Sequence, residues 1–182
     1  MNNLAPHRNA GFSMIEVLVS LIITAVGVLG MVALQSKAIP YTQDSVQRNT
    51  AIMLADDLVE IIRSSAADCT ADNGCLTAPG TDFPAVPATC IPTPVLLADQ
   101  IGCWRARAAA ALPGADSLMN STFYICKTAT PGVVTSCTTS SSTNAELEIQ
   151  VAWTVKSAAD CMTGSTDKTA GTCTYRLRTR IK

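Results

Sequence analysis

The chain has 182 residues, enough for one small domain with its own core, and its formal net charge of −1 gives no general attraction to nucleic acid or anionic membranes. Its eight cysteines lie from Cys69 to Cys173, and an even number is typical of disulfides formed in an oxidising compartment. Metal ligation is the alternative. No C-x-x-C motif occurs and the only histidine is His7, so we expect no metal and no cofactor.

A short polar leader, residues 1–11, precedes an apolar segment that carries no charge over residues 17–36. Residues 12–34 are long enough to cross about 30 Å of hydrocarbon as a helix. An ordinary secretory signal has the opposite order, because its cleavage site follows the apolar region. Arg8 lies on the leader side and the next cation is Lys37, so the positive-inside rule predicts a cytoplasmic leader and an exported remainder.

Gly11, Phe12 and Glu16, in the stretch GFSMIE, resemble the prepilin cleavage motif of type IV pilins and type II secretion pseudopilins. The glycine, the spacing to the glutamate and the uncharged run behind them are together far more specific than the short motif alone. The resemblance implies that the prepilin peptidase, a membrane aspartyl enzyme, cuts after Gly11 and that Phe12 is then N-methylated. It also identifies Glu16 with the glutamate characteristic of the family.

The carboxylate of Glu16 is costly inside a membrane unless it finds a partner. Cleavage gives Phe12 an ammonium group, which methylation leaves charged. Glu16 can pair with this group on its own helix or on a neighbouring subunit, and the second pairing makes it an assembly carboxylate. The alternative is a glutamate that is simply tolerated near the membrane surface. The glycine and the spacing favour the assembly role.

The first helix is expected over residues 12–65, with Pro40 kinking or interrupting it and an amphipathic second half over residues 41–65. The apolar positions at helical spacing are Val46, Leu54, Leu58, Ile61 and Ile62. The charged positions are Asp44, Arg48, Asp56, Asp57, Glu60 and Arg63. Asp56, Asp57 and Glu60 are interpreted as a solvated helix face in preference to a carboxylate site.

The exported head, residues 66–182, begins with DCTADNGC, in which a turn lets Cys69 and Cys75 close a small loop. The acidic residues there lack the arrangement of a calcium loop. A short helix is predicted over residues 94–112, with Thr93 as its cap and Pro94 in its first turn. Its apolar stripe is Leu97, Ile101, Trp104 and Leu112, with Trp104 as a core anchor in preference to a ligand contact. A disulfide between Cys90 and Cys103 is assumed only because these two cysteines follow one another in the sequence.

The sequence from 121 onward predicts an antiparallel sheet. Segments 121–128 and 133–140 flank a Pro-Gly turn, and in a regular hairpin Cys126 and Cys137 would face each other. Two later segments alternate apolar and polar residues and are interpreted as half-buried strands. The apolar positions are Leu147, Ile149, Val151, Trp153 and Val155 in the first, and Tyr175, Leu177 and Ile181 in the second.

Cys161 and Cys173 bracket a polar loop that resembles the disulfide-bounded C-terminal loop of type IV pilins. The last strand also carries a basic face of Arg176, Arg178, Arg180 and Lys182. DNA binding is conceivable for such a face, but no aromatic residues lie between the charges to stack on bases. Charges on an edge strand also discourage aggregation, so nucleic acid is not expected as a partner.

The chain therefore resembles a minor pilin of the type IV pilus, of the PilV class, in SMIEVLVSLIITAVGVLGMVALQ and less specifically in WRARAAAALPG. The resemblance implies an α+β pilin-like fold, in which a long N-terminal helix packs on a disulfide-rich antiparallel sheet. It implies a single-pass inner-membrane subunit with a periplasmic head. That subunit helps prime pilus assembly, contacts major and minor pilins through its helix and enters the extracellular filament. The resemblance further implies that the pilus serves twitching motility, adhesion or DNA uptake.

The alternative within the same resemblance is a type II secretion pseudopilin, although those proteins usually have fewer cysteines. Two further alternatives are a membrane-tethered binding module that never polymerises and a pilin whose head binds a ligand. An enzyme is not expected, because a chain cut after Gly11 keeps no histidine, and no G-x-S-x-G motif or phosphate-binding glycine loop marks a catalytic site.

Overall fold

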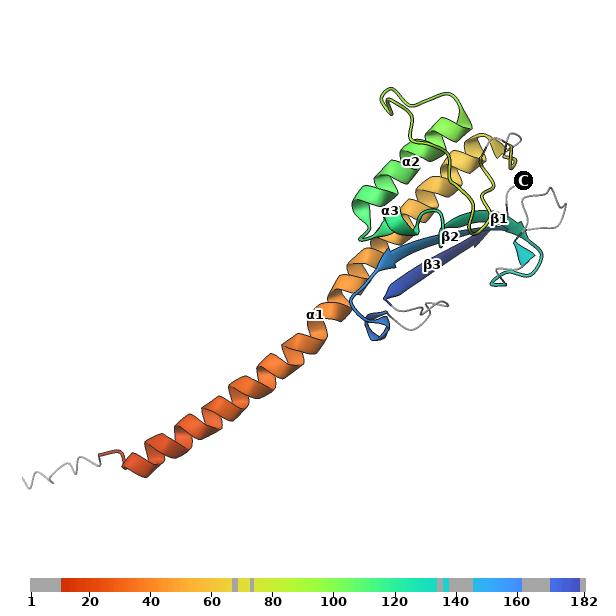
Figure 1. Cartoon of the computed structure of the whole chain (residues 1–182). Helices are drawn as coiled ribbons and strands as arrows, with labels where there is room; N and C mark the ends of the chain where they lie inside the picture. Colours follow the sequence, from red (N-terminus) through yellow and green to blue (C-terminus); the bar gives the residue numbers. More distant parts are fainter. Residues whose placement is uncertain are drawn as a thin grey trace, which may run out of the picture. The chain divides into compact units, whose positions relative to one another are not determined.

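The computed structural model describes residues 11–66, 69–72, 74–133, 136–137, 146–161 and 171–180. The chain forms two compact units, Met1–Pro40 and Tyr41–Lys182. The elements are α1 (Met14–Ser64), α2 (Leu97–Ala111), α3 (Ala115–Leu118), β1 (Tyr124–Thr128), β2 (Glu146–Thr154), a 3-10 turn (Ala158–Asp160) and β3 (Thr172–Thr179). The predicted α+β class, a long N-terminal helix packed on a small antiparallel sheet, is confirmed (Figure 1).

A single helix α1 spans the predicted range and continues through Pro40, so of the two predicted effects of this proline the interruption is wrong and the kink stays a prediction. A proline removes one backbone donor, and the hydrogen bonds on either side of it are enough to carry this helix onward. The buried positions of α1 are Asp44, Ala51, Leu54, Ala55, Leu58, Val59 and Ile62. The prediction was right for Leu54, Leu58 and Ile62, but Val46 is exposed and Ile61 only half-buried.

Asp44, one of the charged positions expected outside the apolar stripe of α1, is 1% exposed. Its Oδ1 atom accepts a hydrogen bond of 3.1 Å from Nε1 of Trp153 in β2. A buried indole N–H needs such an acceptor, and an aspartate on the adjoining helix supplies it. Helical periodicity missed this position because it assigns residues to the core by their polarity alone. It carries no information about a buried hydrogen-bond partner such as Trp153.

Helix α2 begins at Leu97 and not at Thr93 or Pro94, so the predicted start is three residues early. Leu96 is the residue before the first turn and makes no side-chain cap, whereas the Gln100 side chain donates to the Pro94 carbonyl across 2.8 Å. This hydrogen bond fixes the segment before α2 to the helix, although the segment itself is not helical. The helix also ends before Leu112, and the short helix α3 that follows was not predicted.

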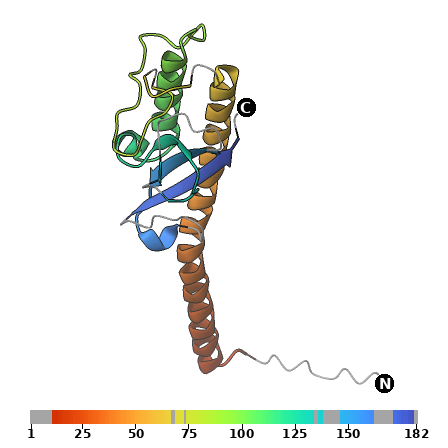
Figure 2. The ribbon, with the colours of Figure 1, turned by 90° about the vertical axis from the view of Figure 1, so that its right-hand side faces the viewer.

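Trp104 anchors α2 in the core, as predicted. It is fully buried and donates its Nε1 hydrogen to the Leu54 carbonyl of α1 across 2.8 Å. Its ring lies 6.2 Å from that of Phe83 and 6.3 Å from that of Phe123. In the head unit, α2 and the second half of α1 lie on one side of the sheet (Figures 1 and 2).

The sheet has the order β1-β2-β3, and both pairs are antiparallel. The apolar residues of β2 face the helices, and Leu147, Ile149, Val151 and Trp153 are all buried, as the alternation predicts. The interpretation of β2 as half-buried is wrong, because Glu148 and Gln150 on its other face are only 2% and 3% exposed. They are covered by polar side chains from both neighbouring strands and by the loop that follows β1.

The predicted hairpin of segments 121–128 and 133–140 is wrong, because β1 pairs with β2. Within segment 133–140 the structure describes Val133, Ser136 and Cys137, and none of the three is in a strand. The hydroxyl of Ser136 bonds to the carbonyls of Thr130 and Val133 and to the hydroxyl of Thr128. Such local side-chain bonds compete with a strand ladder, and β2 offers β1 a longer alternating partner.

Four disulfides close short loops in the head unit: Cys69–Cys75, Cys90–Cys103, Cys126–Cys137 and Cys161–Cys173. They are the four pairs of cysteines that follow one another in the sequence, which is the pairing that the sequence analysis favours. The Cys126–Cys137 bridge forms without the hairpin that suggested it, because the loop after β1 turns back onto the strand.

Candidate functional site

The start of α1 places Gly11, Phe12 and Glu16 close together in the chain. Gly11 to Ser13 precede the helix, and the Ser13 carbonyl accepts hydrogen bonds from the amides of Glu16 at 3.0 Å and Val17 at 3.3 Å. Glu16 therefore lies in the first turn, where the unpaired backbone N–H groups of a helix favour a negative charge. The leader residues 1–10, with Arg8 and His7, lie outside the described residues.

The first half of α1 exposes its apolar side chains. Phe12 is 84% exposed, and every described residue up to Ile39 is exposed. This helix is long and apolar enough to cross a membrane, judged by length and composition. Because a helix that is apolar all round is stable only in an apolar setting, the exposed half requires lipid or protein around it.

Two hydroxyl groups in this apolar half, those of Ser20 and Thr24, are satisfied by their own helix. Ser20 donates to the Val17 carbonyl across 2.8 Å, and Thr24 lies 3.0 Å and 2.9 Å from the carbonyls of Ser20 and Leu21. Such bonds let a hydroxyl enter an apolar environment at little cost. The carboxylate of Glu16 has no equivalent bond within the described part of the chain, so it is the polar group for which an outside partner matters most.

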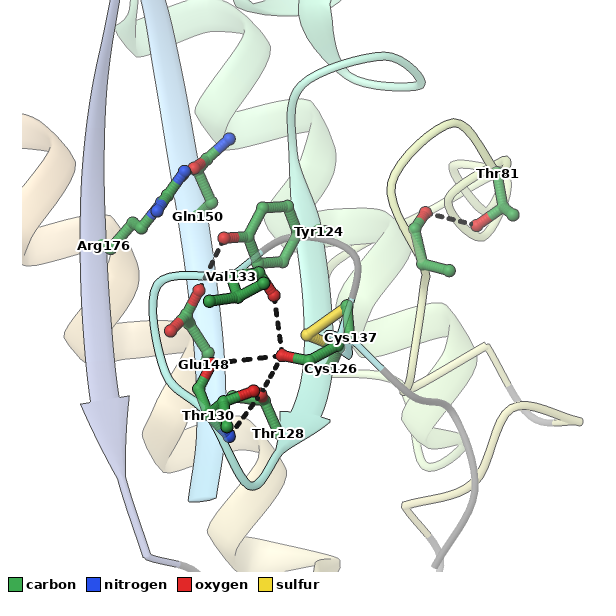
Figure 3. The surroundings of a disulfide bond; sticks show 12 residues. Thr81, Tyr124, Cys126, Thr128, Thr130, Val133, Cys137, Glu148, Gln150 and Arg176 are labelled. Carbon is green, nitrogen blue, oxygen red and sulfur yellow. Dashed lines mark hydrogen bonds between the residues drawn. A yellow bond between two sulfur atoms is a disulfide. The ribbon is translucent and has the colours of Figure 1, made fainter. Parts of the chain in front are cut away.

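A second cluster, which the sequence analysis missed, covers the polar face of the sheet (Figure 3). Glu148 accepts hydrogen bonds from the Tyr124 hydroxyl at 2.6 Å, the Gly132 amide at 2.8 Å and Nε of Arg178 at 3.1 Å. Beside it, Nε of Arg176 donates to Oε1 of Gln150 across 2.5 Å. The signal was present as cross-strand pairs, since Glu148 lies opposite Arg178 and Gln150 opposite Arg176.

Gly132 connects the loop after β1 to this cluster through both of its backbone polar groups. Its amide donates to Glu148, and its carbonyl accepts from Nη1 of Arg176 at 3.1 Å. Its φ of 90° is a conformation that favours glycine, and a Cβ atom would lie 2.9 Å from Nη2 of Arg178. The cluster is thus a closed structural network that holds the loop against the sheet.

The environment of Tyr124 suits this structural role. Burial of its phenol, followed by the hydrogen bond to Glu148 and the negative charge of that group, raises the pKa of Tyr124, although Arg176 and Arg178 act in the opposite direction. The hydroxyl therefore stays protonated and donates to the carboxylate throughout the neutral range.

The arginines of the basic face on β3 are engaged within the head. Arg178 pairs with the buried Glu148, and Nε of Arg180 lies 3.4 Å from Oε1 of Glu146. Lys182 lies outside the described residues. A face whose charges are paired in this way offers less positive potential to a polyanion than the sequence alone suggests.

The carboxylates on the second half of α1 also form pairs. Asp57 accepts a hydrogen bond from Arg107 of α2, and Glu60 lies 2.8 Å from Arg63. Among the residues that the structure describes, no group of three His, Cys, Asp or Glu side chains is arranged to hold a metal ion. Asp68 and Asn73 of the segment DCTADNGC, which lacks the arrangement of a calcium loop, lie outside the described residues.

The family model for the prokaryotic N-terminal methylation motif matches residues 6–32. This motif is the signal of type IV pilins and pseudopilins, which are structural proteins and not a known class of enzyme. It implies processing by the prepilin peptidase and assembly with pilins. No curated protein and no solved structure is significantly similar to the chain.

Proposed function

We propose that the chain is a minor pilin of the type IV pilus, a structural subunit that helps prime pilus assembly and enters the filament. The observation that carries this proposal is the N-terminal methylation motif over residues 6–32, which includes most of the exposed apolar half of α1. In this proposal the helix anchors the subunit in the inner membrane, with the leader cytoplasmic and the head periplasmic. The same helix then packs against those of other pilins.

The motif supports a pseudopilin of a type II secretion system equally well. The four disulfides of the head favour the pilus, because pseudopilins usually carry fewer cysteines. The PilV class, twitching motility, adhesion and DNA uptake rest on resemblance alone. We propose no catalytic activity, since the buried polar cluster is closed and its groups satisfy one another.

Processing can be tested by mass spectrometry of the membrane-extracted chain. A mature protein that begins at N-methylated Phe12 is expected. A chain that keeps residues 1–11 would identify a tethered module that is never processed, and the proposal would be wrong. A Gly11→Leu variant is the control, because a large side chain at this position should block cleavage while leaving the apolar segment intact.

The role in assembly is tested by deleting the gene and scoring sheared surface pili and secreted proteins side by side. Loss of pili with normal secretion is the expected result. Loss of secretion with normal pili would make the chain a pseudopilin. Complementation with the wild-type chain must restore the lost phenotype, which excludes an effect on neighbouring genes.

A further inference from the structure

Residues 86–96, which lead into α2 and are here named the tip segment, gather exposed apolar side chains. Among the described residues after α1, five large apolar side chains are exposed, and four of them lie in the tip segment: Val86, Ile91, Val95 and Leu96. Ile91 is 89% exposed and Val95 93% exposed. Single apolar residues on a surface are normal, whereas a group of them marks contact with another apolar surface.

The tip segment is fixed to the helix that follows it. Cys90 forms a disulfide with Cys103 of α2, and the Gln100 side chain donates to the Pro94 carbonyl across 2.8 Å. These two links hold the segment at two points, although it has no helix or strand of its own. Its apolar side chains are therefore already in position, and a binding partner does not have to order them first.

The tip segment lies at the end of the head unit where α1 ends and α2 begins (Figures 1 and 2). Tyr41, the first residue of the head unit, lies at the opposite end of this stretch of α1. Helical residues 41–64 extend for about 36 Å, at about 1.5 Å per residue. The tip segment is thus far from the residue at which the apolar half of α1 joins the head.

The composition of the tip segment favours a lipid surface over a groove on another protein. The segment contains no Trp, Tyr or Arg, the residues that contribute most of the binding energy at protein interfaces. It also contains no charged residue, so nothing in it would fix the orientation of a protein partner by electrostatics. Aliphatic side chains need no matching shape in hydrocarbon, because lipid chains rearrange around them.

The backbone of the tip segment also suits the boundary between lipid headgroups and acyl chains. Unsatisfied backbone groups are costly in an apolar medium. Three of the eleven residues are prolines, which have no N–H group. The carbonyl of Ile91 accepts a hydrogen bond of 3.0 Å from the Thr89 hydroxyl, as that of Pro94 does from Gln100. These features lower the cost of bringing an irregular segment into the lipid boundary.

We propose that the tip segment inserts its apolar side chains into the surface of a phospholipid bilayer other than the one that holds the apolar half of α1. This inference goes beyond the proposed function and holds whether or not the chain enters a filament. Ile91, Val95 and Leu96 are the side chains that enter the lipid. Because the segment is uncharged, binding requires no anionic lipid and is insensitive to salt.

The test uses the full chain held in phosphatidylcholine nanodiscs and measures how many nanodiscs float with added phosphatidylcholine vesicles. Val95→Asp places a carboxylate on the tip segment, and Val133→Asp makes the same change at an exposed valine in the loop after β1. We expect capture of Val95→Asp to fall at least about fivefold, because a charge opposes entry into lipid. Val133→Asp should stay within about twofold of wild type. Equal thermal unfolding of the two variants shows that the head is intact.

The contact is located by an environment-sensitive fluorescent amino acid at the exposed position 93, with nitroxide-labelled lipid placed either in the vesicles or in the nanodisc. Quenching by vesicle lipid is the expected result, and it should persist when the salt concentration is raised. Quenching by nanodisc lipid alone, capture by anionic vesicles only, or equal capture of Val95→Asp and Val133→Asp would overturn the proposal. The methylation motif plays no part in this assay, so such a failure would leave the proposed function standing.

Discussion

Trp153 of β2 donates its indole N–H to the carboxylate of Asp44 in α1 across 3.1 Å, and both side chains are buried. Arg48 lies in α1 one turn after Asp44, and its guanidinium carbon is 5.9 Å from the centre of the Trp153 ring. The end of the sheet is therefore fixed to the start of the helical segment within the head unit by a polar contact in an apolar setting. Such contacts specify one packing arrangement because few alternatives satisfy the same groups.

Asp44→Ala is expected to lower the free energy of unfolding by about 1–3 kcal/mol, because the buried indole N–H of Trp153 loses its acceptor. Asp44→Asn should cost clearly less, since an amide oxygen can still accept. Urea unfolding of the full chain in detergent, followed by tryptophan fluorescence, measures the difference. An Asn49→Ala variant on the exposed face is the control, and an Asp44→Ala loss no larger than that of the control would contradict the role of this contact.

The two arginine–glutamate pairs of the sheet should differ in strength. Arg178→Ala is expected to cost about 1–2 kcal/mol, because Glu148 is buried and loses a charged donor, a value reduced by the partial exposure of Arg178. Arg180→Ala should cost less than about 0.5 kcal/mol, since its pair with Glu146 lies in solvent. Thermal unfolding of both variants provides the comparison. Equal losses would mean that the polar cluster adds nothing beyond ordinary surface charge.

Tyr124 predicts a loss of stability at alkaline pH. Its pKa in the folded head is raised above the ordinary value of 10.0, mainly by burial and then by Glu148. The fold therefore favours the protonated phenol, so its contribution is complete below pH 10 and declines as the pH rises above the unfolded value toward the folded one. Burial raises the pKa of Tyr175 as well. A Tyr124→Phe variant should therefore still lose free energy of unfolding at alkaline pH, but less than wild type. Unfolding curves at increasing pH should show a weaker decline in that variant than in wild type.

Replacing Cys161 and Cys173 together by serine is expected to lower the free energy of unfolding by about 2–4 kcal/mol, because the unfolded chain loses a cross-link. Cys173 is fully buried in β3 opposite Trp153, so the change should also loosen that end of the sheet. Hydrogen exchange of β3 amides, compared with those of β1, measures this local effect. An unchanged exchange rate in β3 would show that the strand holds its place without the bridge.

Glu16→Ala should leave membrane insertion unchanged and reduce incorporation into filaments, because docking no longer compensates a carboxylate. Ser20→Ala is the matched control, since its hydroxyl is already satisfied by the Val17 carbonyl of the same helix. Quantitative blotting of membrane and sheared-filament fractions checks both. Wild-type levels of the Glu16→Ala variant in filaments would show that Glu16 has no role in assembly.

Sequence periodicity predicted the elements that bury a single apolar face. The alternation of β2 located Leu147, Ile149 and Val151 in the core, and helical spacing located Trp104 in α2. Each of these residues reveals its position by its own polarity. The same reasoning requires no knowledge of which segment lies opposite.

Periodicity failed where a residue's environment depends on a distant partner. Glu148 is polar yet buried because Tyr124 and Arg178 reach it from the two neighbouring strands. Val46 is apolar yet exposed because it lies on a side of α1 that the head core does not cover. The hairpin after β1 failed for a related reason, since β2 competes as a partner from a position further along the chain.

The pairing of the cysteines bears on how the head is made. Each cysteine is joined to the next one along the chain, with sequence separations of 6, 13, 11 and 12 residues, and no bridge crosses another. An oxidase that joins thiols in the order in which they emerge from a translocon would form the native set directly. Maturation of this head would then depend on a donor of oxidising equivalents and not on a disulfide isomerase.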